Sequence, residues 1–205
     1  MHSLIRHMIL GWVSLLVLAG CATSPSQPVN VEWQTHQLVL QDIQAYQLTG
    51  KLGYIAPDQR QSFNFQWQKS PQQLSLRLTN FLGQTVLNLH VNEQGAQVDT
   101  YDDQTYRDQD AQSLIQRLTG LDIPVAQLED WLLGLPTQAS AYQLNSHNTL
   151  AQLSKFTATA QWQVEYQRYQ TIEWQNQQLL LPDRLKLQQN NTSIQLAISQ
   201  WTLHP

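Results

Sequence analysis

The side chains that could do chemistry in this chain are few and dispersed. Beyond residue 20 there are four histidines, at spacings that do not suit a metal site: His36, His90, His147 and His204. Asp102 and Asp103 are adjacent, so in a strand their carboxylates would face opposite sides and could not act together. We interpret them as a turn pair, which needs no catalytic role. The sequence has neither a Gly-x-Ser-x-Gly elbow nor a phosphate-binding loop. We therefore expect no catalytic residue, no metal and no cofactor.

The one thiol, Cys21, is the exception. It follows Leu18-Ala19-Gly20, and before these lie Arg6 and an apolar stretch at 8–18, which is how a secretory signal peptide is built. The stretch is shorter than the ~20 residues that span a bilayer. Leu-Ala-Gly-Cys resembles a bacterial lipobox, in which the thiol is acylated and the chain is cut before the cysteine. We predict a signal peptide at 1–20 and lipidation of Cys21; the alternative is a plain signal peptide with an incidental cysteine.

Composition narrows the class of protein. Removal of residues 1–20 takes away one of 11 basic residues and none of 15 acidic ones, which leaves a net charge of −5. Such a charge argues against a nucleic-acid partner. Residues 21–30 are polar with two prolines, typical of a flexible tether, and residues 31–205 have the length of a single domain. We expect this domain to be a monomer.

Hydrophobic periodicity predicts the elements of the domain. A helical spacing covers 31–43, and a period of two follows in 62–68, 74–78 and 87–91, with polar turns between. Two helices are predicted at 111–118, with Asp108 or Asp110 near the N-cap and Gly120 at the end, and from Pro124 to Gly134. Alternation returns at 161–166, 185–187 and 194–198. The pattern predicts an α+β fold, in which helices cover a curved antiparallel sheet.

Large aromatic side chains are candidates to line the space between helices and sheet. We select five of them: Phe65, Trp67, Trp131, Trp162 and Trp201. Ordinary core packing explains each of them equally well, because an aromatic stripe has the same spacing in both cases.

The turn at 79–84 carries large apolar residues where polar ones are usual. Phe81 and Leu82 precede Gly83 at its tip. Turn tips are normally exposed, so these side chains either fold back onto the sheet or form an exposed apolar finger that inserts into a membrane or a partner.

Several motifs in order resemble the LolB family, the outer-membrane receptors of bacterial lipoprotein sorting. Besides the lipobox and Trp33 with His36, they are Tyr46-x-x-x-Gly50, Phe65-x-Trp67-Gln68, Leu78-Thr79-Asn80-Phe81-Leu82-Gly83, Leu118-Thr119-Gly120-x-x-Ile123-Pro124 and Trp131-x-x-Gly134-Leu135-Pro136. The resemblance implies a half-closed, unclosed barrel with an apolar cavity. That cavity would take lipoprotein acyl chains from a periplasmic LolA-like carrier and release them into the inner leaflet of the outer membrane.

The resemblance also implies roles for single residues. Leu82 matches a protruding-loop leucine implicated in delivery, and Phe81 stands where the family often has proline, so the turn should be less rigid. Ala22 after Cys21 fits outer-membrane delivery, with the domain on the periplasmic face. We expect the handover to need no nucleotide and the protein not to be an enzyme. The alternatives are an outer-membrane assembly scaffold and a lipid-anchored envelope hydrolase.

Overall fold

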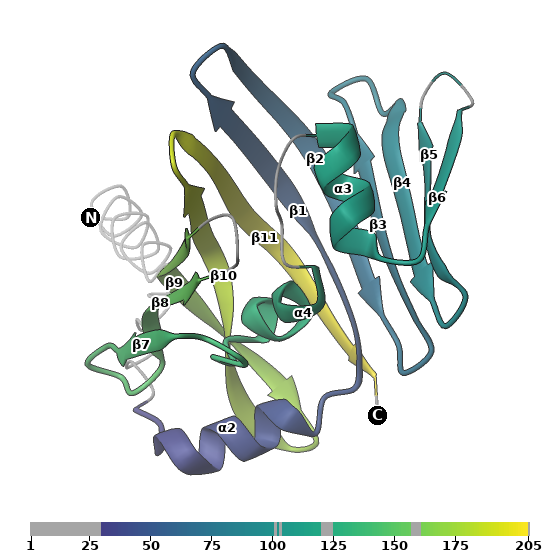
Figure 1. Ribbon diagram of the computed structural model, residues 1–205. Coiled ribbons are helices and arrows are strands. Elements are labelled where there is room, and N and C mark those ends of the chain that lie inside the picture. The colour runs from purple at the N-terminus through teal and green to yellow at the C-terminus, as the bar shows by residue number, and fades with distance from the viewer. Residues whose placement is uncertain (1–29, 101, 103, 120–124, 157–160, 205) are drawn as a thin grey trace, which may run out of the picture.

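The fold is a single open sheet of eleven antiparallel strands with helices packed against it (Figure 1). The computed structural model describes residues 30–100, 102, 104–119, 125–156 and 161–204, so Cys21, Gly120 and Pro124 lie outside the described residues. The spatial order is β6-β5-β4-β3-β2-β1-β11-β10-β9-β8-β7. The strands are β1 Ala45–Ala56, β2 Gln59–Lys69, β3 Gln73–Thr79, β4 Thr85–Asn92, β5 Gly95–Thr100, β6 Thr105–Asp108, β7 Ala141–Leu144, β8 Leu150–Phe156, β9 Gln161–Trp174, β10 Gln177–Gln189 and β11 Thr192–His204.

Alternation along the strands separates an inner from an outer face. On β9, Trp162, Val164 and Tyr166 are buried, whereas Gln161, Gln163 and Glu165 between them are exposed. The glutamines therefore form the solvated face, as expected for an antiparallel sheet covered on one side. The predicted hairpins are confirmed: β2 pairs with β3 and β4 with β5.

The first and last strands join the two halves of the sheet. β1 pairs with β11 along its length, with one register shift between Thr49 and Gly50. A Cβ atom on Gly50 would overlap the carbonyl oxygen of Ala197, so the close approach of these strands requires glycine. In the described part of the chain β6 and β7 end the sheet without pairing to each other, so the barrel is unclosed, as predicted.

Three helices are described. They are α2 Trp33–Gln41, α3 Ala111–Thr119 and α4 Val125–Leu133, which agrees with the predicted segments. Glu32 caps α2, where its carboxylate accepts from the Thr35 N–H at 2.8 Å. Asp110 caps α3 by accepting from the Ser113 N–H at 2.7 Å, while Asp108 instead pairs with Arg117 at 2.7 Å.

The helices cover the apolar face of the sheet. α3 packs against β5, β6 and α4, and α4 packs against β10 (Figure 1). None of the described helices is long and apolar enough to cross a membrane.

Candidate functional site

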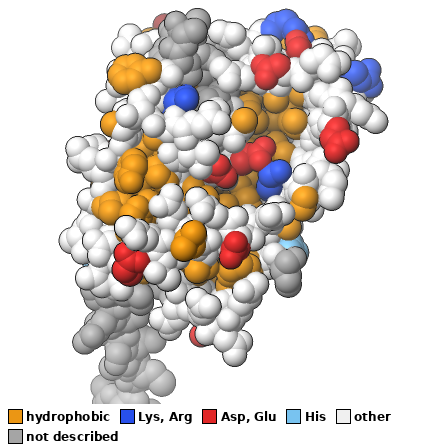
Figure 2. Space-filling view, turned by 60° about the horizontal axis from the view of Figure 1, so that its bottom comes forward, with side chains coloured by type: hydrophobic (Ala, Val, Ile, Leu, Met, Phe, Trp, Pro, Cys, Tyr) orange, Lys and Arg blue, Asp and Glu red, His pale blue; other side chains and the backbone are white. Residues whose placement is uncertain are grey.

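An apolar cavity lies between the two mid-chain helices and the central strands. Its volume is about 80 Å³. The lining side chains are all apolar and come from β1–β4, β10, β11, α3 and α4: Leu52, Phe65, Trp67, Leu76, Leu89, Ile115, Val125, Leu128, Leu132, Leu187, Ile194 and Leu196. Figure 2 shows a hollow floored by hydrophobic side chains, with charged side chains at its rim. The lining that the described residues provide favours a hydrophobic ligand.

The predicted aromatic residues divide into two groups. Phe65 and Trp67 lie on β2 and line the cavity. Trp131, Trp162 and Trp201 are buried elsewhere in the core and do not line it. The indole N–H of Trp131 donates to the Thr137 carbonyl at 3.2 Å, and that of Trp201 to the Pro182 carbonyl at 2.9 Å. These contacts to backbone are those of core side chains, which is the alternative that the sequence left open.

Most of the lining was missed by sequence reasoning because it is aliphatic. Leu76 on β3 and Leu89 on β4 are direct cross-strand partners, and Leu52 lies on β1, with β2 between β1 and β3. The signal for Leu76 and Leu89 was present in the alternation of leucines along their strands. Only the cross-strand register, which the sequence does not show, brings them to one place.

Buried tyrosines fasten α4 over the sheet. The hydroxyl of Tyr46 on β1 donates to the Glu129 carbonyl at 2.5 Å, and that of Tyr166 on β9 donates to the Trp131 carbonyl at 2.8 Å. Burial raises the pKa of both hydroxyls far above the ordinary value, so they stay protonated donors. Both carbonyls belong to α4, and that of Trp131 also accepts from the Gly134 N–H at 3.1 Å, so each tyrosine adds a contact between the helix and the sheet.

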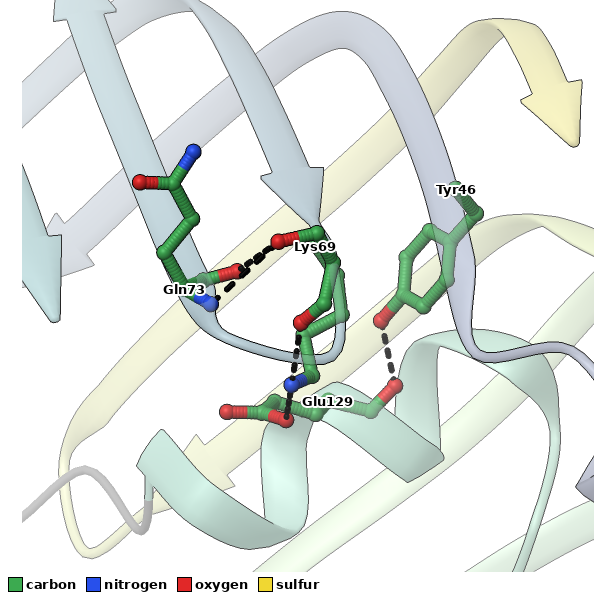
Figure 3. A network of polar contacts seen from close by, with 5 residues as sticks. Tyr46, Lys69, Gln73 and Glu129 are labelled. Carbon is green, nitrogen blue, oxygen red and sulfur yellow. Dashed lines mark hydrogen bonds and ion pairs between the residues drawn. The ribbon is translucent and has the colours of Figure 1, made fainter. Parts of the chain in front are cut away.

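An ion pair lies beside the Tyr46 contact (Figure 3). The Lys69 ammonium at the end of β2 lies 3.2 Å from the Glu129 carboxylate and also donates to the Ser70 carbonyl at 2.8 Å. Burial raises the pKa of the Glu129 carboxyl, and the charge of Lys69 opposes that effect. The β2–β3 turn is thus tied to the same helix as β1.

The turn between β3 and β4 projects its apolar tip into solvent. Phe81 is 87% exposed and Leu82 is 67% exposed, so of the two alternatives for this turn the exposed finger is the one observed. The Asn80 carboxamide oxygen accepts from the N–H groups of Leu82 and Gln84, both at 3.0 Å. Gly83 has a φ of +81°, which favours glycine. These bonds form an ordered turn although residues 79–84 contain no proline.

The histidines do not assemble into a site. Among the described residues no group of three His, Cys, Asp or Glu side chains could hold a metal ion. His36 is buried in α2, and this burial lowers its pKa. His90 is exposed on β4 and contacts Asn88 at 2.8 Å.

Comparison with known proteins places the chain in a family. The family described as "Outer membrane lipoprotein LolB" matches residues 44–201. The chain belongs to the LolB family. A curated LolB from Vibrio cholerae, named "Outer-membrane lipoprotein LolB", is 75% identical over all of both chains. A LolB from Vibrio vulnificus is 49% identical over 94% of this chain and 96% of that one.

Solved structures share the fold at low sequence identity. A DUF1329 family protein from Desulfovibrio piger has a TM-score of 0.59 and 8% identity, covering 82% of this chain and 89% of its own. A putative outer membrane lipoprotein-sorting protein domain from Vibrio parahaemolyticus has a TM-score of 0.52 and 6% identity, covering 85% and 92%. The LolB fold is therefore one case of a wider architecture.

Proposed function

We propose that the protein is an outer-membrane receptor for lipoproteins. It accepts them from a periplasmic LolA-like carrier, binds their acyl chains in the apolar cavity and inserts them into the outer membrane. Membership of the LolB family and the names of the relatives support this role. The observation that carries it is a cavity whose described lining consists of apolar side chains, in a domain that also exposes an apolar loop.

The cavity must enlarge before it can bind an acyl chain. At about 80 Å³ it is well below the roughly 300–1,000 Å³ of ordinary ligand pockets. An acyl chain enters only if side chains repack or a helix moves. α4 is fastened by Tyr46 and Tyr166, whereas α3 is held to β6 through the exposed Arg117–Asp108 pair. We therefore assign the movement to α3, which contributes Ile115 to the cavity.

The energetics explain why no nucleotide is needed. Each methylene that leaves water gains ~0.8 kcal/mol, so release of acyl chains into solvent is prohibitive. If the carrier docks at the opening, the chains pass from one apolar surface to another. The direction then depends on the difference in affinity between the two cavities and the membrane.

The anchor and the loop divide the remaining work. Lipidated Cys21 holds the domain at the periplasmic face of the outer membrane. Phe81 and Leu82 make the membrane contact through which acyl chains are released. Their exposure in an ordered turn supports this part of the proposal.

Uptake of a fluorescent fatty-acyl probe by residues 22–205 tests the binding step. The variant Leu128→Trp adds bulk at a cavity-lining position of α4 and should weaken probe binding at least tenfold. The matched control is Leu118→Trp on α3, which also packs against the core but does not line the cavity. Circular dichroism establishes that both variants fold. Absence of binding by the unaltered domain would contradict the proposal and favour the assembly scaffold.

A further inference from the structure

A second set of exposed apolar side chains lies at the opposite end of the sheet from the β3–β4 turn. We define the α2–β7 surface by Leu38 and the half-buried Trp33 on α2 and by Tyr142 and Leu144 on β7. Leu38 is 64% exposed and Tyr142 is 47% exposed. The rings of Trp33 and Tyr142 lie 6.1 Å apart, so the first turn of α2 packs against the edge strand. Figure 2 shows further hydrophobic side chains gathered away from the hollow, with acidic side chains among them.

The chain enters the domain beside this surface. The Val31 N–H donates to the His147 carbonyl at 3.2 Å, and the Asn148 amide donates to the Val31 carbonyl at 3.0 Å. Both partners lie in the turn between β7 and β8. Nine residues separate Cys21 from Val31. At roughly 3.3–3.6 Å per residue, a lipid on Cys21 keeps Val31 within ~35 Å of the bilayer.

The charges around the surface indicate which kind of membrane contact it fits. Residues 30–50 contain Glu32 and Asp42 but no lysine or arginine, and residues 139–149 contain no charged Asp, Glu, Lys or Arg. These two segments therefore supply no lysine or arginine to attract anionic headgroups. Trp and Tyr beside exposed leucines are instead typical of side chains seated at the interface between headgroups and acyl chains.

We propose that the α2–β7 surface is a second membrane-contact surface, which rests on the phospholipid bilayer while Cys21 anchors the chain. This inference rests on the lipid anchor of the proposed function. It is separate from the delivering loop: β7 is seven strand positions from β3 in the sheet, ~34 Å along it at ~4.8 Å per strand. The protein therefore has two membrane-bound orientations, one resting on α2 and β7 and one with Leu82 inserted.

A fluorescent probe at position 38 tests the contact. The full mature chain carrying Leu38→Cys, labelled with NBD, is reconstituted in phosphatidylethanolamine–phosphatidylcholine vesicles with brominated acyl chains. The matched control is Gln195→Cys on the exposed outer face of β11. We expect a blue shift and at least twofold stronger quenching at position 38 than at position 195, unchanged when anionic lipid is added. Leu144→Cys gives the same readout from β7 if the label at position 38 disturbs α2.

Each outcome has a defined meaning. Equal quenching at positions 38, 144 and 195 would overturn the inference, and so would quenching that appears only with anionic lipid. Incorporation of cargo lipoprotein is measured in the same vesicles. A chain that delivers cargo without enhanced quenching at position 38 would support the proposed function and contradict membrane contact by the α2–β7 surface. A second label per chain in the mass spectrum would show a free Cys21 thiol. That result would contradict lipidation of Cys21, on which both the proposed function and the α2–β7 surface rest.

Discussion

The hydroxyl of Tyr46, in the first strand, donates to the backbone carbonyl of Glu129, 83 positions later in the chain. Tyr166 makes the equivalent bond to the Trp131 carbonyl from the other half of the sheet. One helix, α4, is thus fixed to both β1 and β9 through two of its carbonyl oxygens. We therefore expect α4 to stay in place when an acyl chain enters the cavity.

Removal of either hydroxyl should weaken the domain by a measurable amount. Tyr46→Phe and Tyr166→Phe each remove one hydrogen bond between the sheet and α4, so we expect a loss of about 1 kcal/mol in the free energy of unfolding. Urea denaturation followed by circular dichroism measures it. Tyr106→Phe, on the exposed edge strand β6, is the matched control and should change stability little. Equal stability of all three variants would contradict the role given to these bonds.

The Glu129 carboxyl should make stability depend on pH. Its pKa is raised in the folded state, chiefly by burial, and Lys69 only partly offsets this. The folded chain therefore binds this proton more tightly than the unfolded chain does. The associated stability is fully present below the unfolded pKa of about 4.5 and is lost as the pH rises through the folded pKa.

Two substitutions isolate that effect. Glu129→Gln cannot titrate, so the fall in the free energy of unfolding above pH 4.5 should become smaller. Lys69→Met removes the opposing charge, should raise the Glu129 pKa further and should lower stability at pH 7.5. Denaturation curves at pH 4.5, 5.5, 6.5 and 7.5 measure both. The idea is wrong if Glu129→Gln retains the full pH dependence of the unaltered chain.

Local signals in the sequence predicted the helices and strands but not which residues line the cavity. The alternation at 161–166 and the spacing at 111–118 depend on neighbours along the chain, and both became elements of the expected kind. Trp131, Trp162 and Trp201 have equally clear spacing, yet they pack in the core. Which inner-face residue meets the cavity depends on strand register and on where α3 and α4 lie, and both are long-range properties.

The turn at 80–84 also has a property that the sequence pattern did not reveal. The missing proline before Leu82 suggested a looser turn, whereas the Asn80 side chain supplies hydrogen bonds that order it. Asn80→Ala should lower stability by about 1 kcal/mol and speed amide exchange at Leu82 and Gln84. Hydrogen exchange measures the change, with Asn92→Ala in the β4–β5 turn as control. Unchanged exchange at Gln84 would show that the backbone alone orders the turn.

Leu82 carries the sharpest functional prediction. Leu82→Glu places a charge on a side chain that is already 67% exposed, so fold and stability should stay as they are. Acceptance of cargo should also persist, because Leu82 does not line the cavity. Release should fail, since insertion of a carboxylate into the hydrocarbon region is strongly unfavourable.

The measurement follows labelled lipoprotein from a carrier to the receptor and then into vesicles. Gln94→Glu, in the polar β4–β5 turn, adds the same charge and should leave both steps intact. Normal incorporation by Leu82→Glu would remove the delivery role from the loop and leave the cavity and the anchor as the parts to test next.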